Sequence, residues 1–208
     1  RYVLLTSDVF EKEWGPEWHT LRSAKLHSTV DFSGRKFFLE TLTGEPEKGL
    51  FHPGVHPEQI EILNVSKNQL TDISCLNSKT DGGRHVFRNL QVLNVSRNML
   101  TEVRLQLENL TMLNLSYNEL VTLPSFMALR ELQKLVLSHN HLDGTLKDFV
   151  HNTKLWYLDV SSNQFSWRPS FFREQLDCLE RCHIRELKLW PNPFADHFRS
   201  ISSSRFKL

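Results

Sequence analysis

The sequence contains no long apolar run. Among its 208 residues, no stretch reaches the roughly 18 consecutive apolar residues that a membrane-spanning helix requires. The sequence therefore predicts no membrane span. The chain begins with Arg1 rather than methionine, and we expect it to be a segment of a longer protein.

A net charge is also nearly absent. Lysine and arginine total 25 and aspartate and glutamate total 24, which gives a formal charge of +1. Because no global field attracts the chain to a polyanion or a membrane surface, the charge balance does not favour nucleic acid as a partner. With 39% hydrophobic and 11% aromatic residues, the chain has the composition of an ordinary folded protein.

Cysteine is scarce. The three cysteines, Cys75, Cys178 and Cys182, are odd in number and too few for a disulfide-stapled secreted scaffold. They favour a reduced, intracellular protein of the cytoplasm or nucleus. Cys178 and Cys182 lie four residues apart, next to His183, but a zinc site needs more ligands at short spacing. We therefore expect ordinary core cysteines, with no metal and no cofactor.

Motifs of catalysis are missing as well. The ten histidines are dispersed, and His52 and His56 lie beside prolines rather than on a helix. The chain has no H-E-x-x-H, no G-x-S-x-G, no phosphate-binding glycine loop and no paired-carboxylate motif. We therefore predict that this chain is not an enzyme.

The sequence does contain one pattern, repeated six times. It reads L-x-x-L-x-L-x-x-N-x-L, with isoleucine, valine and phenylalanine accepted in place of leucine, and LQVLNVSRNML at residues 90–100 is a clear copy. The asparagines lie about 30, 20, 22, 23 and 29 residues apart, which is typical of stacked supersecondary units. The copies begin at Ile60, Leu90, Leu110, Leu132, Leu155 and Ile184, and their asparagines are Asn68, Asn98, Asn118, Asn140, Asn163 and Asn192.

Each position of the pattern has a physical reason. The L-x-L alternation has a period of two, so we expect Leu113 and Leu115 to point inward from a short strand while Asn114 points to the other face. Asn118 follows at a bend, where its side-chain amide can donate to and accept from backbone groups that have left the ladder. Successive strands then stack in parallel, and no copy buries its apolar face alone.

These copies resemble the leucine-rich repeat family over roughly residues 58–208. The resemblance implies an α/β solenoid with a curved parallel sheet on the concave face, short helices and loops on the convex face, and a cap at each end. We accordingly expect a flanking segment at 1–57, about six repeats at 58–194 and a C-terminal cap at 195–208.

The end of the chain resembles the cap of intracellular leucine-rich repeat proteins, where an N-P-aliphatic turn leads to an aromatic-arginine pair. The turn here is Asn192-Pro193-Phe194 and the pair is Phe198-Arg199. Phosphatase-1 regulatory subunits, spliceosomal leucine-rich proteins and mRNA export factors carry such caps. Phe194 departs from the family pattern, which has an aliphatic residue at that position.

Two segments lie outside the regular pattern. VDFSGRKF at residues 30–37 parallels LNVSKNQL at 63–70 as a degenerate copy, while Trp14 and Trp18 lie among charged residues that read either as an N-terminal cap or as a docking segment. After the fifth copy, residues 170–182 predict a helix with Phe172, Leu176 and Leu179 on one face.

The variable positions beside the inward leucines define an exposed strand face. Asparagine and serine dominate it in the first copies, whereas aromatic and charged residues appear in the later ones. The later composition is that of an interaction hot spot, although solvated strand residues would look the same. The candidate partner-binding residues are Met112, Asn114, Lys134, Val136, Tyr157, Asp159, Glu186, Lys188 and Trp190.

The sequence therefore predicts a non-catalytic protein–protein interaction module, a scaffold, adaptor or regulatory subunit, that binds a protein partner through its concave strand face. One alternative is an RNA-linked adaptor resembling mRNA export factors, with Arg97 and Arg104 among its basic residues. The other is an extracellular receptor ectodomain, in which N-x-S/T sequons would carry glycans. We interpret the sequons as a by-product of the repeat consensus. They lie at Asn64, Asn94, Asn109 and Asn114.

Overall fold

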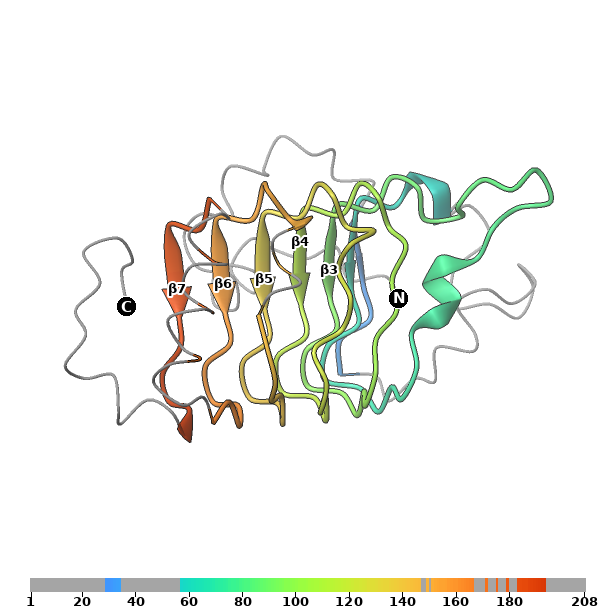
Figure 1. Cartoon of the computed structure of the whole chain (residues 1–208). Helices are drawn as coiled ribbons and strands as arrows, with labels where there is room; N and C mark the ends of the chain where they lie inside the picture. The colour runs from blue at the N-terminus through green and yellow to red at the C-terminus, as the bar shows by residue number, and fades with distance from the viewer. Residues whose placement is uncertain are drawn as a thin grey trace.

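The computed structural model describes residues 29–34, 57–146, 149, 151–166, 171, 175, 179 and 183–193. The described residues form a seven-stranded parallel sheet in which every strand pairs with the next one along the chain. Figure 1 shows β3 to β7 side by side, with the rest of each turn behind them. The strands are β1 (Thr29–Asp31), β2 (Ile62–Asn64), β3 (Val92–Asn94), β4 (Met112–Asn114), β5 (Lys134–Val136), β6 (Tyr157–Asp159) and β7 (Glu186–Lys188).

This architecture confirms the predicted leucine-rich repeat solenoid. Two short 3-10 helices, η4 (Pro57–Gln59) and η5 (Ser74–Asn77), lie in the segments that connect the strands. In the part of the chain that the structure describes, no helix is long and apolar enough to cross a membrane.

The register of the sheet follows the repeat frame. Leu63, Leu93 and Leu113 occupy the central position of successive strands and pair with one another, and none has exposed surface. Val30 pairs with Leu63, so β1 occupies the register that the comparison of VDFSGRKF with LNVSKNQL predicts. Each strand is three residues long, and in β2 to β7 the repeat asparagine follows four residues after the strand ends.

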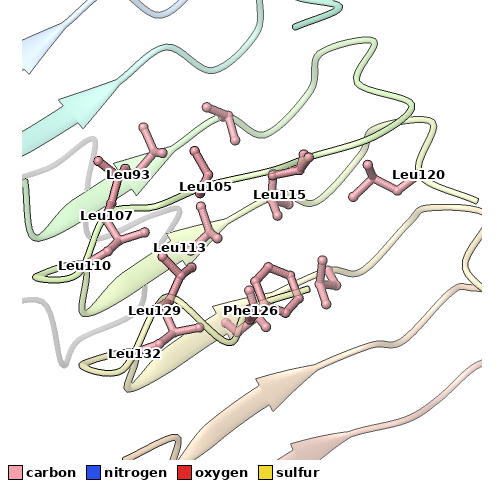
Figure 2. Packing of buried hydrophobic residues seen from close by; sticks show 14 of the residues in the cluster. Leu93, Leu105, Leu107, Leu110, Leu113, Leu115, Leu120, Phe126, Leu129 and Leu132 are labelled. Carbon is pink, nitrogen blue, oxygen red and sulfur yellow. The ribbon is translucent and has the colours of Figure 1, made fainter. Parts of the chain in front are cut away.

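The core lies between the strands and the segments that return to the next strand. In Figure 2, Leu105, Leu107 and Phe126 from the return segments pack toward Leu113 and its neighbours. The leucines labelled near Leu113 in Figure 2 are buried, among them Leu93, Leu107, Leu110, Leu115 and Leu129. Each fully buried leucine contributes about 1.5–3 kcal/mol relative to an exposed one.

The asparagines form a continuous hydrogen-bond ladder, as predicted. Nδ2 of Asn98 donates to the carbonyl of Val95 in its own copy at 2.9 Å and to the carbonyl of Val65 in the preceding copy at 3.1 Å. Its Oδ1 accepts from the backbone N–H of Leu70 at 3.0 Å. The side chain is 7% exposed, so these bonds replace water for groups that have left the sheet.

The segment after the fifth copy is helical at its described residues, Phe171, Gln175 and Leu179. Leu179 is buried, as predicted, and Phe171 packs against the core. Gln175 is also fully buried, and its Oε1 accepts from the backbone N–H of Leu146 at 2.7 Å. The spacing of these three residues places them on one helical face; Phe172 and Leu176 lie outside the described residues.

Candidate functional site

The sheet register aligns eight of the nine candidate partner-binding residues in two columns. Met112, Lys134, Tyr157 and Glu186 pair along the first position of β4 to β7. Asn114, Val136, Asp159 and Lys188 pair along the third position. In each strand the central leucine points inward and separates the first position from the third. The side chains of both columns therefore share the opposite face of the sheet.

The exposure of this face increases toward β7. Val92 and Asn94 in β3 are each 1% exposed, whereas the side chains of Glu186 and Lys188 are 35% and 52% exposed. The expectation of an exposed face is therefore wrong for four of the candidate residues. These are Asn114, Lys134, Tyr157 and Asp159, which are 5–8% exposed.

Asn114 is buried because its side chain folds back onto its own turn. Its Oδ1 accepts from the backbone N–H of Ser116 at 2.9 Å and from the Ser116 hydroxyl at 2.7 Å. Asn64 and Asn94 accept from the serine two residues on in the same way. A short polar side chain that satisfies its own backbone at a strand end forms an Asx-type turn. Asp159 repeats the arrangement with Ser161.

Tyr157 lies between two lysines from the neighbouring strands. Nζ of Lys134 in β5 lies 4.3 Å from the centroid of its ring, and Nζ of Lys188 in β7 lies 5.3 Å from it. Both distances are within the range of cation–π attraction. Lys188 also lies 3.9 Å from the carboxylate of Glu186. The phenol is therefore held in place from both sides.

The ionisation of this group follows from the same contacts. Burial raises the pKa of the Tyr157 hydroxyl, because desolvation disfavours the phenolate. The hydrogen bond to Tyr157 raises the pKa of Lys188, because it favours the charged ammonium. At neutral pH the group therefore presents a neutral phenol and a cationic Lys188.

Trp190 does not lie in a strand, because β7 ends at Lys188. It is partly buried and packs against the hydrophobic core. It occupies the repeat position that is Ser66, Ser96 or Ser116 in the earlier copies. Trp190 therefore flanks the β7 end of the sheet, next to the exposed Lys188.

A second group of side chains, which the repeat pattern does not single out, lies directly before five of the six repeat asparagines. Here the backbone is left-handed, with φ between 53° and 59°. This conformation is uncommon outside glycine, and it turns each side chain outward at the end of its strand. The position is the unconstrained second x of L-x-x-N. It is occupied by Lys67, Arg97, Tyr117, His139 and Ser162.

Three of these side chains stack on one another. The Arg97 guanidinium lies 4.2 Å from the centroid of the Tyr117 ring. The rings of Tyr117 and His139 lie 4.0 Å apart with an angle of 10° between their planes. All three residues are exposed. We call this group the Arg97–Tyr117–His139 stack.

A polar chain runs alongside that stack. Nε2 of His141 lies 2.9 Å from Oε2 of Glu119, and its Nδ1 lies 3.2 Å from Nε2 of Gln164. Met99 is 51% exposed in the corresponding position of the second copy. The edge of the sheet that follows the strands therefore carries planar, polar and apolar groups in register.

The cysteines offer little chemistry in the described structure. Burial, assisted by the nearby charge of Asp72, raises the pKa of the Cys75 thiol to about 11, so its thiolate is scarce at neutral pH. No group of three or more histidine, cysteine or acidic side chains suited to a metal ion occurs within the described ranges. Cys178 and Cys182, like Trp14, Trp18, Phe194, Phe198 and Arg199, lie outside them.

Comparison with known proteins supports the same fold. Residues 88–142 match the family model described as leucine rich repeat. No curated protein sequence matches the chain. Among solved structures, TLR13 in complex with ssRNA13 is 25% identical with a TM-score of 0.59, and the match covers 81% of this chain and 22% of TLR13. This chain thus spans only about a fifth of the length of that protein.

Two bacterial structures are also similar. Internalin C2 of Listeria monocytogenes is 18% identical with a TM-score of 0.55, over 84% of this chain and 69% of the internalin. A leucine-rich repeat protein of Leptospira interrogans is 26% identical with a TM-score of 0.53, over 65% of this chain and 32% of its own. The chain is thus a leucine-rich repeat solenoid, a fold that generally serves as a protein-interaction module rather than a catalyst.

Proposed function

We propose that this protein is a non-catalytic module that binds a protein partner through the β6–β7 end of its strand face. The observation that carries the proposal is the group around Tyr157, in which Lys134 and Lys188 hold the ring from both sides. Lys188 and Glu186 at its edge remain accessible. Aromatic residues are enriched at protein interfaces, where charged groups at the rim set orientation and specificity.

The rigidity of the strands around Tyr157 also supports partner binding at this surface. The strands beneath Tyr157 are tied to their neighbours through paired backbone positions on both sides. A side chain that is already ordered loses little conformational entropy when a partner binds. The mixed signs of Lys188, Glu186 and Asp159 suit a partner surface that also carries both charges, rather than a uniformly charged polymer.

Charge reversal at the exposed edge tests this proposal. Tyr157 and Trp190 contribute to packing, so alanine at either position would change stability as well as binding. Lys188→Glu and Glu186→Lys change accessible groups instead. Arg130→Glu is the matched control, since Arg130 is exposed in the segment that precedes β5.

The measurement is affinity purification with wild-type and variant baits, followed by quantitative mass spectrometry and by binding assays on each captured protein. We expect Lys188→Glu to release a protein that wild type and Arg130→Glu both retain, while all three baits remain folded. Equal capture by all of the baits would contradict the proposed surface.

We further propose that the protein acts inside the cell, in the cytoplasm or nucleus. Its few cysteines support this location. So does the burial of Asn64, Asn94 and Asn114, which are 1–5% exposed, because a glycan on any of them would displace the turn. Fluorescence localisation of the tagged natural protein tests the proposal, and recovery from the culture medium would contradict it.

RNA binding is a second candidate function. It is favoured by the exposed Arg97–Tyr117–His139 stack, because planar rings with a cation are a platform for unpaired bases. The similar TLR13 structure contains a single-stranded RNA. Arg104, in contrast, lies beside Glu102, with Nη2 3.4 Å from Oε2.

Fluorescence anisotropy with a labelled single-stranded RNA tests this second function. We expect binding that weakens with salt, and a loss of about fivefold or more in Tyr117→Ala, since base stacking on an aromatic ring contributes about 1–3 kcal/mol. Met127→Ala is a control at an exposed apolar position away from the stack. Absence of binding at low salt would contradict RNA recognition by this chain.

A further inference from the structure

A pocket of about 220 Å³ lies at the edge of the sheet where β3 and β4 begin. Residues 83–88, which lead into β3, form one wall, and residues 106–109, which lead into β4, form the other. The Arg97–Tyr117–His139 stack follows the strands and therefore lies on the opposite edge. The pocket is thus separate from both surfaces discussed under the proposed function.

The first wall is built by a hairpin-like loop. Backbone N–H groups of Thr80 and Val86 donate to the carbonyls of Arg84 and Ser78 at 2.8 and 2.9 Å. Gly83 has φ of 74°, a conformation that glycine adopts without steric cost. The Asp81-Gly82-Gly83 sequence predicts a surface loop here, and in Figure 1 this segment projects from the stack of turns. The loop carries Arg84 and His85 to the pocket.

The floor of the pocket is apolar and its rim is cationic. Phe87 and Leu107, which line it, are 1% and 2% exposed. Arg84 and Arg88 are exposed at the rim, and neither guanidinium forms an ion pair with any residue in the described ranges. Glu108 contributes the single carboxylate of the lining.

One buried polar atom in this lining lacks a partner. Nδ1 of His85 is shielded from solvent and makes no hydrogen bond within the described part of the chain. Buried polar atoms in folded proteins are usually paired. Within the described ranges, this lining combines a ring nitrogen without a hydrogen-bond partner, two guanidinium groups without ion pairs and an apolar floor. This combination indicates a site that is completed by a ligand.

We infer that this pocket binds a phosphate monoester carried on a compact apolar or aromatic body. Guanidinium groups pair with phosphate oxygens through two parallel hydrogen bonds, and two of them suit a dianion. The body of the ligand covers Phe87 and Leu107, and His85 lies beside it in the lining. The same chemistry is offered by a free phosphate ester and by a phosphorylated side chain of another protein.

Titration of the labelled protein with phenyl phosphate, followed by NMR, tests the inference. Saturable shifts are expected at the backbone amides of His85, Phe87 and Leu107. Phenol, which keeps the ring and lacks the phosphate, is the matched ligand and should bind at least about tenfold more weakly, since charge-assisted hydrogen bonds are the strong ones. Shifts absent at millimolar phenyl phosphate, or equal affinity for phenol, would overturn the inference.

Arginine variants distinguish phosphate binding in this pocket from a general effect of surface charge. Arg84→Ala/Arg88→Ala should weaken binding by about tenfold or more with an unchanged thermal midpoint, while Arg104→Ala, which removes an exposed arginine outside the pocket lining, should not. Arg84→Lys/Arg88→Lys keeps the charge and should recover part of the loss. An unchanged affinity in the alanine double variant would overturn the assignment.

Two further measurements test the contribution of His85 and the source of the ligand. His85→Leu should weaken binding without lowering the thermal midpoint, because it removes an atom that has no hydrogen-bond partner among the described residues. A lower midpoint with unchanged affinity would overturn the role of His85. A phosphotyrosine peptide that binds more tightly than phenyl phosphate identifies a phosphorylated protein as the source of the ligand. Equal affinities identify a free phosphate ester.

Discussion

The backbone N–H of Leu100 donates to Oδ1 of Asn118 at 3.1 Å. The asparagine of one copy therefore closes the turn of the copy before it. Nδ2 of Asn118 completes the link by donating to the carbonyls of Val95 and Leu115 at 3.1 and 3.0 Å. Through these three bonds, one side chain links backbone groups of two successive copies.

We expect Asn118→Ala to be strongly destabilising. The substitution leaves buried backbone groups without partners, and each such group costs about 1–3 kcal/mol. A loss of about 2–4 kcal/mol in the free energy of unfolding, measured by urea denaturation, is therefore expected. Gln133→Ala, at an exposed position beside β5, should change it by less than about 0.5 kcal/mol. Equal midpoints for the two variants would contradict the ladder's contribution.

The left-handed backbone before the asparagines gives a second expectation. Ser162 has φ of 53°, and a β-branched side chain in this region is sterically unfavourable by about 1–2 kcal/mol. Ser162→Val should lower the unfolding free energy by about that amount, whereas Ser162→Gly should not lower it. Ser166→Val, at an exposed residue of the same copy without positive φ, is the control. A stable Ser162→Val variant would contradict the strained turn.

The pKa of Cys75 predicts its reactivity. With a thiol pKa of about 11 in place of 9.0, the thiolate population at pH 8 should be about a hundredfold smaller in the folded protein than in the unfolded chain. Site-resolved mass spectrometry after iodoacetamide treatment, with and without urea, measures this difference. Equal rates of modification at Cys75 in the two conditions would show that the thiol is not protected.

The same shift affects stability at high pH. Because the folded-state pKa is raised, Cys75 stabilises the folded protein below pH 9 and loses that contribution as the pH rises from 9.0 to about 11. We expect the alkaline loss of stability to be smaller in Cys75→Ser, which has no thiol to ionise. Denaturation curves at pH 8 and at about pH 10.5 measure the difference.

The contact between Tyr157 and Lys188 predicts a shift that NMR can follow. The hydrogen bond to the Tyr157 hydroxyl raises the pKa of Lys188, so Tyr157→Phe should lower that pKa while the ring remains beside Lys134. The pH titration of the Lys188 side-chain signals gives the value directly. A Lys188 pKa that stays constant in Tyr157→Phe would contradict the contact.

The repeat frame predicted the fold because its chemistry is local and periodic. Leu93, Leu113 and Asn118 occupy the positions that the pattern predicts, since only an apolar side chain fits the core and only a short amide satisfies the bend. The parallel register follows directly, because copies of the same frame stack with equivalent residues opposite one another.

The candidate surface was predicted less completely. Alternation places Asn114 and Tyr157 on the outer face of the sheet, but it does not report that Asn114 folds back onto Ser116 or that Tyr157 has 7% exposure. Burial on this face depends on side-chain contacts beyond the repeat. The stack of Tyr117 on His139 was missed because its position is free in the consensus, and only the backbone geometry of the turn brings those rings together.

The direction of the asparagine ladder has a consequence for synthesis on the ribosome. Leu70 receives its acceptor from Asn98, Leu100 from Asn118 and Leu120 from Asn140. A turn is therefore left open at the moment it leaves the exit tunnel and is closed only when the following asparagine emerges. Translation and turn closure proceed in the same direction, so the asparagine of each newly made copy completes the hydrogen bonds of the copy before it.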